Sequence, residues 1–234
     1  MSGTSIDHDQ NGNPVGPIVE NWTPRPRPPR TPMIGRTCDV VPLTIAHAAD
    51  LHAANITDLT GNMWAYLTSG PYASLADYEK WVAASEASED PLFHAVIDKA
   101  TGKAVGSCSY LRIDPPGGVI EVGWIAWSPL LQKTVMATEA MYLMMRRVFD
   151  ELGYRRYEWK CNALNAPSMR AAERFGFTYE GTFRQAAINR GRNRDTAWFS
   201  ILDSEWPDRK ARFERWLDPA NFDEKGRQKV KLGG

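Results

Sequence analysis

Cysteine and histidine are scarce in this 234-residue chain, and their spacing excludes several kinds of site. The three cysteines, Cys38, Cys108 and Cys161, lie far apart and form no CxxC pair. An odd number of separated thiols favours neither a disulfide framework nor a thiolate zinc site, so we expect buried free thiols. The four histidines form neither HxxxH nor HExxH, and we therefore expect no metal.

The chain also lacks a long apolar run and an excess of either charge. No stretch reaches the roughly 18 consecutive apolar residues that span a bilayer, and 28 Lys and Arg balance 28 Asp and Glu. Nucleic acid and anionic lipid bind clustered basic residues, so we expect neither as a partner. The amino terminus lacks the basic start and apolar stretch of a secretory signal, which predicts a soluble protein of the reducing cytoplasm.

The composition fits one globular domain between two tails. Hydrophobic residues make up 43% of the chain and include nine Trp, eight Tyr and eight Phe, enough for a substantial core. Residues 1–35 end in the proline-dense TPRPRPPRTP, which predicts an extended arm that packs on the domain, stays loose or binds a partner groove. The domain covers 36–217, and 218–234 is a charged tail that we expect to fray.

The hydrophobic periodicity changes repeatedly between those tails and predicts a mixed α/β domain. Strands are expected over 38–43, 90–98, 103–113, 119–128, 154–161, 177–185 and 196–202, and helices over 44–55, 74–87, 136–152, 166–175 and 205–217. Ser74 is the expected N-cap of the second helix. The three strands between 90 and 128 form an antiparallel meander, and two strand-helix crossings follow.

The junction of the strand 119–128 with the helix after it is a candidate anion site. A helix start presents backbone N–H groups and the positive end of the macrodipole, so the loop from Gln132 to Thr138 can hold a pyrophosphate without a metal. Every strand-loop-helix junction has these groups, and a plain connection remains the alternative.

The sequence of this junction and two further segments make the interpretation specific. The segments QKTVMATEA at 132–140, NAPS at 165–168 and AERFGF at 172–177 together resemble the GNAT superfamily of N-acetyltransferases, in particular the branch that acetylates amino termini of ribosomal proteins. The resemblance implies a mixed, mostly antiparallel sheet with splayed fourth and fifth strands. It also implies transfer of acetyl from acetyl-coenzyme A (acetyl-CoA) to a primary amine by direct attack. Many relatives dimerise, which leaves a homodimer open.

The resemblance implies acetyl-CoA contacts from three segments. Backbone of Trp124, Ile125 and Ala126 would contact the acetyl and pantetheine groups, and Asn165 would hydrogen-bond the pantetheine arm. The other expected contacts are Gln132, Lys133, Thr134, Val135, Met136, Ala137, Thr138, Ser168 and Arg174. Val135 replaces the first glycine of the family's Q/R-x-x-G-x-G/A loop, and a β-branched residue takes positive φ only with strain. We therefore expect the loop to keep negative φ.

Acetyl transfer needs a stabilised thioester oxyanion and a proton for the leaving thiolate. Backbone N–H groups near Ile125 are expected to stabilise the oxyanion. By resemblance, Ser168 protonates the thiolate, although it is equally read as a residue that satisfies a helix N-terminus. The tyrosine that many relatives use as the acid is Ala172 here. This change and Val135 motivate an alternative function, a coenzyme A binding protein with weak or lost catalysis.

Glu121 is the candidate base. Simple alternation places it on the strand 119–128 opposite Ile120, Val122 and Trp124, where it can order a water that takes the amine proton. The alternative is an ion-paired surface group. An α-amine is roughly a tenth neutral at pH 7 and a lysine amine about one part in a thousand. A weak base therefore favours a protein or peptide α-amine, or a small-molecule amine of similarly low pKa.

Two further groups stay open on sequence alone. Trp64, Tyr66 and Tyr72 would, by resemblance, lie over the acceptor site, or they simply cap the core. The segment RGRNRD at 190–195 concentrates arginines that either bind an acidic substrate or the cofactor, or form a solvated hairpin.

Overall fold

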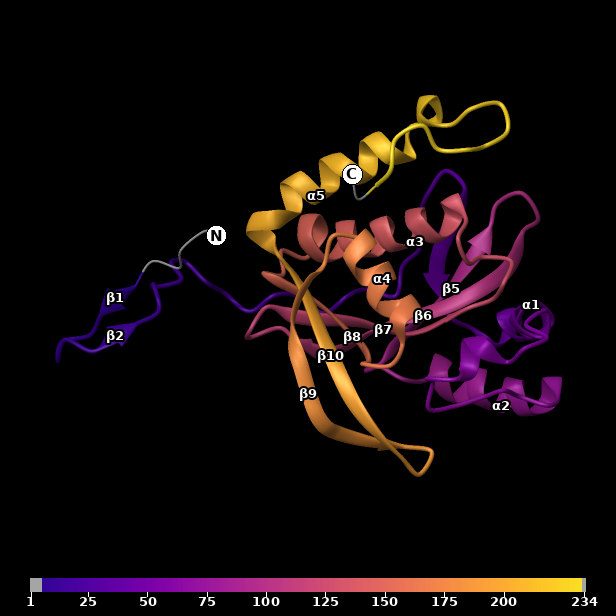
Figure 1. The fold of residues 1–234 in the computed structure, drawn as a ribbon, viewed down its shortest axis with the longest axis horizontal. Helices are drawn as coiled ribbons and strands as arrows, with labels where there is room; N and C mark the ends of the chain where they lie inside the picture. Colours follow the sequence, from indigo (N-terminus) through magenta and orange to yellow (C-terminus); the bar gives the residue numbers. More distant parts are fainter. Residues whose placement is uncertain (1–5, 233–234) are drawn as a thin grey trace.

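A single sheet of eight strands organises the computed structural model, which describes residues 6–232 (Figure 1). The strands are β3 (Met33–Ile34), β4 (Cys38–Pro42), β5 (Leu92–Asp98), β6 (Lys103–Asp114), β7 (Val119–Trp127), β8 (Arg156–Asn162), β9 (Thr178–Asn189) and β10 (Arg192–Leu202). Their order is β3-β4-β5-β6-β7-β8-β10-β9, and only β7 and β8 pair in parallel. This confirms the mixed, mostly antiparallel sheet.

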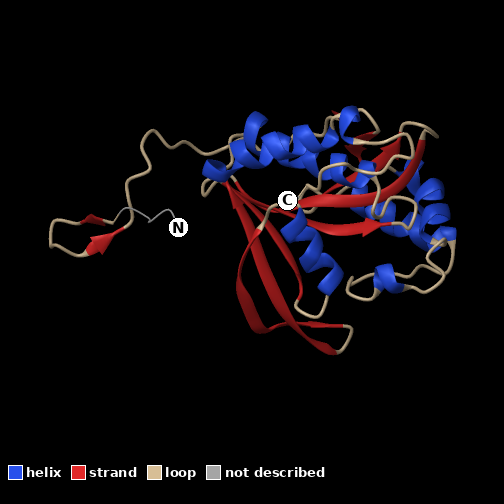
Figure 2. Ribbon diagram, turned by 45° about the horizontal axis from the view of Figure 1, so that its top comes forward, coloured by secondary structure: helices blue, strands red, loops and turns tan. Residues whose placement is uncertain are grey.

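Helices cover the sheet on both faces. The helices are α1 (Ala48–Asn55), α2 (Leu75–Glu86), α3 (Val135–Arg146), α4 (Ala166–Arg174) and α5 (Trp206–Leu217). Side chains of α3, α4 and α5 pack with one set of sheet residues, and those of α1 and α2 with another (Figure 2). We call these sides the α3 face and the α1 face. Each face has its own hydrophobic core.

Most expected elements are confirmed, with shifted ends. Ser74 caps α2 by accepting from the backbone N–H of Asp77 at 3.1 Å. The first expected helix is divided into a 3-10 turn, η1 (Ile45–His47), and α1, and the third ends in a π-helical turn, η3 (Arg147–Glu151). The hairpin of β9 and β10 is longer than predicted, because residues 187–189 pair with 192–194 and only 190–191 form the turn.

The parallel strands β7 and β8 separate partway along their length. They pair from Val119 with Arg156 to Val122 with Trp159, and both continue beyond that point, to Trp127 and Asn162. The splay expected for these two strands is therefore present, and it opens a gap in the middle of the sheet.

A β-bulge in β7 corrects one prediction. The register with β6 shifts between the Gly123–Ser109 and Ala126–Ser107 pairs, and Trp124 has φ +49°. The extra residue reverses the alternation, so Trp124 packs in the core of the α1 face although Ile120 and Val122 lie on the α3 face. Glu121 and Trp124 therefore share a face, which simple alternation excludes.

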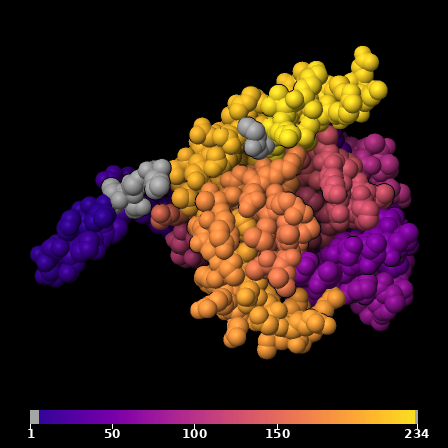
Figure 3. Space-filling model, viewed as in Figure 1, coloured from indigo at the N-terminus to yellow at the C-terminus, as the bar shows by residue number. Residues whose placement is uncertain are grey.

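The proline-rich segment divides into a packed part and a projecting part. Trp22 donates from Nε1 to the carbonyl of Pro116 at 2.8 Å, Arg147 donates to the carbonyl of Thr31 at 2.6 Å, and Met33 is buried in the core. Residues 22–34 thus form a strap on the domain. Before it, β1 (Asp7–His8) and β2 (Pro14–Val15) form a small separate hairpin, which the space-filling view shows clear of the body (Figure 3).

The expectation that the carboxyl-terminal tail frays is wrong for its described residues. Leu232 is 5% exposed and belongs to the core of the α3 face. Trp216 of α5 donates from Nε1 to Oε1 of Gln228 at 2.7 Å, and the ring of Phe222 packs edge-on against Trp216. A few apolar residues thus hold this charged segment on the domain after the turn η5 (Pro219–Asn221).

No helix in the described range is both long and apolar enough to cross a membrane.

Candidate active site

A cavity of about 230 Å³ occupies the gap between β7 and β8. It reaches residues from both faces of the sheet. Its lining includes Tyr66, Leu67, Leu111, Glu121, Trp124, Ile125, Trp159, Lys160, Cys161, Asn165, Ser168 and Arg194. Five predicted site residues, Glu121, Trp124, Ile125, Asn165 and Ser168, are therefore brought together, although the sequence separates them by up to 47 positions.

Glu121 is buried in a network of charges. It is 5% exposed, and its Oε2 accepts from Nζ of Lys160 at 2.7 Å and lies 3.5 Å from Nε of Arg112. Burial raises the pKa of Glu121, and the two cations oppose that rise. The carboxylate is thus less acidic than an exposed glutamate, as a group that accepts a proton must be. It is ion-paired, but it does not lie on the surface.

Lys160 was not anticipated from the sequence. Its Nζ lies 2.7 Å from Glu121, 3.0 Å from Oε2 of Glu158 and 3.6 Å from the ring centre of Trp198. Burial disfavours ionisation of Glu158, yet donors from Arg156 and Lys160 keep its pKa below the ordinary value. One lysine is therefore shared by two carboxylates. Strict alternation in RYEWKCN already put Glu158 and Lys160 on one side of the strand, but only the parallel register with β7 brings them to Glu121.

Ser168 and Asn165 belong to the first turn of α4. The Asn165 side chain accepts from the Ser168 backbone N–H at 3.2 Å and so caps the helix. The Ser168 hydroxyl accepts from Nε1 of Trp159 at 3.1 Å. That hydroxyl can still donate a proton into the cavity, because the indole bond uses one of its lone pairs. Ala172, where many relatives have a tyrosine, is fully buried and supplies no acid.

The loop before α3 forms a helix start with one strained residue. Thr134 is the N-cap: its hydroxyl donates to the Leu131 carbonyl at 2.6 Å and accepts from the Ala137 N–H at 3.2 Å. The expectation of negative φ holds at Val135 but is wrong at Lys133, where φ is +62°. The positive φ therefore falls at Lys133, two residues before Val135, which occupies the position of the family's first glycine. The first-turn N–H groups of Val135 and Met136 are left at the positive end of α3.

The remaining residues of the predicted acetyl-CoA set lie near this helix start or along β7. Gln132 donates from Nε2 to the Trp127 carbonyl at 2.7 Å, so its side chain fixes the loop. Arg174, at the end of α4, donates to the hydroxyl of Thr138 at 3.1 Å and thereby places a guanidinium beside the first turn of α3. Ala126 is buried on the α1 face, outside the cavity lining.

The aromatic residues of the loop between α1 and α2 were expected either to lie over the acceptor site or to cap the core, and both arrangements occur. Tyr66 lines the cavity, and its hydroxyl donates to the Leu164 carbonyl at 2.9 Å, so it bridges the α1 side to the loop before α4. Trp64 and Tyr72 pack edge-on in the core of the α1 face and cap that core. In the arginine segment, Arg194 lines the cavity and Arg190 donates to the carbonyl of Ser69 at 2.8 Å.

The three cysteines are buried free thiols, as expected. Cys161 lines the cavity, where burial raises the pKa of its thiol, which disfavours a nucleophilic thiolate. Among residues 6–232, no group of three or more His, Cys, Asp or Glu side chains is arranged to hold a metal ion.

Comparison with known proteins assigns the family. Residues 39–178 match the model of the acetyltransferase (GNAT) domain. A GCN5-related N-acetyltransferase from Brucella melitensis is 51% identical, with a TM-score of 0.90 over 92% of this chain and 97% of that one. A GNAT-family structure from Chromobacterium violaceum is 37% identical, with a TM-score of 0.77 over 83% and 98% of the two chains.

Among curated sequences, the N-acetyltransferase p20 of Bacillus licheniformis, described as uncharacterized, is 30% identical over 112 residues. That alignment takes in 48% of this chain and 62% of the relative, so the chain spans less than two thirds of that protein's length. The family match covers more than half of the chain, and the chain belongs to the GNAT acetyltransferases, whose general activity is acetyl transfer from acetyl-CoA. The class inferred from the QKTVMATEA, NAPS and AERFGF segments is confirmed.

Proposed function

We propose that this protein transfers acetyl from acetyl-CoA to a primary amine held in the cavity between β7 and β8, by direct attack. The observation that carries the proposal is the buried carboxylate of Glu121, which opens into this cavity across from Ser168 of α4. A carboxylate and a hydroxyl that converge on one gap supply the two proton-transfer groups that aminolysis of a thioester uses.

The splay supports the placement of the acyl donor. Beyond Val122 and Trp159 the two strands no longer pair, so their facing backbone groups can hydrogen-bond the amides of a pantetheine arm as an added strand would. The start of α3 then takes the pyrophosphate on the N–H groups of Val135 and Met136, with Lys133 as a nearby cation. Arg174 adds a second positive charge beside Thr138.

The reaction follows from these positions. Glu121, through an ordered water, accepts a proton from the amine, and the amine nitrogen attacks the thioester carbon. Backbone N–H groups at the bulge near Ile125 hold the oxyanion. The C–N bond forms and the C–S bond breaks. The Ser168 hydroxyl passes a proton to the departing thiolate and regains one through cavity water from the amine nitrogen, which sheds its second proton as the amide forms. No covalent enzyme intermediate is needed, which agrees with the absence of a low-pKa thiol at Cys161.

The acceptor proposed is an amine of low pKa, such as a protein or peptide α-amine or a comparable small-molecule amine. Even with its pKa raised by burial, a carboxylate held by Lys160 and Arg112 is a weaker base than an amine, so it gains most from an amine that is already partly neutral. The motif resemblance favours amino termini of the ribosomal-protein type. Tyr66 and Leu67, from the loop between α1 and α2, line the cavity, and we place the acceptor against them. Such amines are present in the cytoplasm, the compartment that we propose for this protein.

Two measurements test the proposal. Calorimetric titration with acetyl-CoA measures donor binding, and release of free thiol with a panel of peptides and small amines measures transfer. Lys133→Glu places a carboxylate beside the phosphates, so we expect acetyl-CoA to bind more than tenfold more weakly, about 1.4 kcal/mol or more. Lys225→Glu, an exposed lysine of the carboxyl-terminal segment, is the matched control and should bind normally.

The results also separate the second candidate, a coenzyme A binding protein with weak or lost catalysis. Ala172 in place of the tyrosine acid is the observation that favours it. Tight acetyl-CoA binding with no thiol release for any amine would establish this second function. Unchanged affinity in Lys133→Glu would remove the loop at 132–138 as the phosphate site.

A further inference from the structure

The amino-terminal arm, residues 6–21, stands apart from the rest of the molecule. Every one of its residues is exposed, and its internal bonds are the β1–β2 pairing and the turn held by Asp9. Within the described range, no hydrogen bond or ion pair joins the arm to residues 22–232. Both ribbon views show the arm projecting from the side where the strap begins (Figures 1 and 2).

An arm of this kind needs a surface to hold it. An isolated two-stranded hairpin is at best marginally stable in water. This one also carries four exposed aliphatic side chains, Ile6, Val15, Ile18 and Val19, with exposed fractions from 41% to 78%. Their burial on another surface would supply the missing stabilisation. The arm is acidic as well, because it has three acidic residues and no lysine or arginine precedes Arg25.

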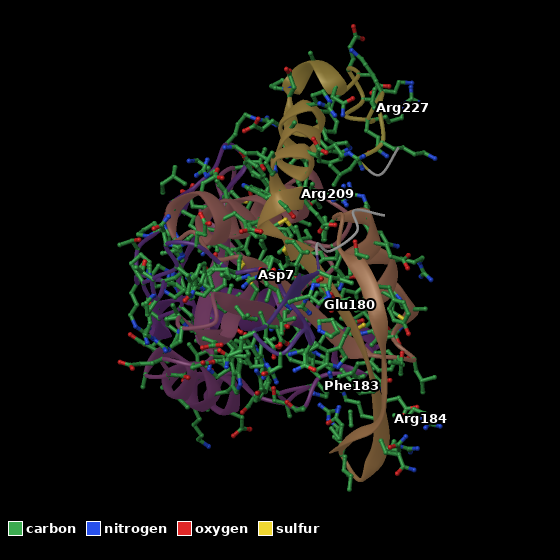
Figure 4. The ribbon with its side chains drawn as sticks, turned by 90° about the vertical axis from the view of Figure 1, so that its left-hand side faces the viewer. Asp7, Glu180, Phe183, Arg184, Arg209 and Arg227 are labelled. Atoms are coloured by element: carbon green, nitrogen blue, oxygen red, sulfur yellow. The ribbon has the colours of Figure 1, made fainter. Side chains whose placement is uncertain are left out.

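The β9–β10 tip, residues 183–194, has the complementary character. β9 is the edge strand of the sheet, and its Phe183 and Ile188 are 58% and 82% exposed. Four arginines lie in the tip, at positions 184, 190, 192 and 194. Figure 4 shows Phe183 and Arg184 on the part of the hairpin that extends beyond the body, with Arg184 pointing outward. An exposed edge strand with apolar side chains is a surface that favours association.

We propose that the arm of one copy docks on the β9–β10 tip of a second copy, so that two copies of the chain exchange arms in a symmetric dimer. Acidic side chains of the arm meet the arginines of the tip, and the exposed aliphatic residues cover Phe183 and Ile188. Because each copy has one arm and one tip, a single two-fold axis satisfies both contacts and closes the assembly.

The position of Trp22, where the arm joins the domain, favours docking on a second copy over docking on the arm's own chain. Trp22 is fixed at the β6–β7 turn, beside the end of β10, whereas the tip is at the other end of that strand. β10 has 11 residues, and a strand of that length spans roughly 35 Å. Between the hairpin and Trp22 lie residues 16–21, which reach about 20 Å when extended. This linker alone does not span the strand, and both ribbon views show the arm projecting away from the β9–β10 hairpin of its own chain (Figures 1 and 2).

Sedimentation velocity on the full chain at micromolar concentration tests the dimer. We expect a dimer for the native chain and more than tenfold weaker association when residues 1–20 are removed. Charge reversal in the arm (Asp7→Lys with Asp9→Lys and Glu20→Lys) or in the tip (Arg184→Glu with Arg192→Glu) should do the same. An equimolar mixture of the two reversed proteins should dimerise again, because both contacts are then complementary. Reversal of two exposed arginines of α5 (Arg212→Glu with Arg215→Glu) is the control and should leave the dimer intact.

A disulfide trap distinguishes the two copies. Val15→Cys and Phe183→Cys in one chain should give a cross-linked dimer on oxidation, since the native thiols are buried. A link within one chain would show that the arm folds back on its own tip and would overturn the proposal. A native chain that stays monomeric, or a dimer that survives removal of the arm, would overturn it as well. None of these readouts depends on acetyl transfer, so failure here and failure of the proposed function are separate results.

Discussion

The α1 face of the sheet changes character at the gap between β7 and β8. Over β4 to β7 it is apolar and covered, with Leu51 of α1, Tyr78 of α2 and Phe93 of β5 in one core. On β8 and β10 the same face carries Glu158, Lys160 and the ring of Trp198. In the covered half, hydrophobic burial holds the helices on the sheet. In the other half, which we call the charged half, the buried charged side chains each require an oppositely charged partner. Glu121, on β7, lies at the boundary between the two halves. Because it pairs with Lys160 of β8, we count it with the charged half.

This difference separates stability from chemistry. Burial of apolar area on α1 and α2 contributes favourably without any directional requirement. A buried ion-pair network is weak support for stability, because desolvation offsets much of the attraction. We therefore expect these three charged side chains to serve reactivity or specificity rather than stability. Variants of the covered half should therefore change the free energy of unfolding, and variants of charged residues that line the cavity should change turnover.

The largest expected effect is in the covered half. Leu51 is fully buried, and Leu51→Ala should lower the free energy of unfolding by about 2–5 kcal/mol through lost burial and the cavity left behind. Leu59→Ala is the control, because Leu59 is 95% exposed; its effect should stay within about 0.5 kcal/mol. Urea unfolding followed by tryptophan fluorescence measures both. Equal effects at the two leucines would show that α1 does not stabilise the sheet.

In the charged half, Glu121→Gln should lower kcat/KM by roughly 10² at neutral pH while unfolding changes little. Because burial raises the pKa of Glu121, the native enzyme should lose activity as pH falls through a value above that of an exposed glutamate. The variant lacks this acid limb, and its defect should shrink at high pH, where the amine deprotonates by itself.

Glu158→Gln is the matched control for this variant. It removes the other carboxylate of Lys160 but does not line the cavity. We expect it to keep most of the activity. A pH profile of Glu121→Gln that runs parallel to the native profile would show that Glu121 is structural.

A smaller effect is expected across the gap, at α4. Ser168→Ala should lower kcat about tenfold and change KM for acetyl-CoA less, because a proton donor to the thiolate acts after attack. Trp159→Phe is the control: it removes the indole donor to Ser168 but keeps the hydroxyl. If Ser168→Ala raises only KM, the hydroxyl is a cofactor contact, and the proton comes from water.

The boundary between the covered half and the charged half also separates the features that the sequence predicted from those that it could not predict. Periodicity located the strands and helices of the covered half, and the family segments located α3 and α4 with Asn165 and Ser168. Those features depend on local pattern. The bulge at Trp124 and the left-handed Lys133 were missed, because each is a non-glycine residue held at positive φ by its surroundings. No local signal marks such a position.

The lysine of the charged half was missed for a different reason. Its role depends on the register between β7 and β8, which are separated by a helix and pair in parallel. Alternation alone could place Glu158 and Lys160 on one side of their strand, but not opposite Glu121. The contact of Arg190 with Ser69 and the burial of Leu232 likewise depend on packing between distant parts of the chain.

Lys160 gives the smallest and most diagnostic change. In Lys160→Met the cation nearest Glu121 is lost while the length of the side chain over Trp198 is nearly kept. A cation favours the ionised carboxylate, so its removal raises the pKa of Glu121 further, and the acid limb of kcat/KM should move up by about one pH unit. Lys160→Arg should restore the native limb. Arg112→Met is the matched control: Arg112 lies 3.5 Å from the same oxygen, but its side chain is 61% exposed. Because water screens an exposed charge, this variant should move the limb less. A limb that stays fixed in Lys160→Met would mean that the titrating group is not Glu121, and the acid limb would then have to be assigned to the amine itself.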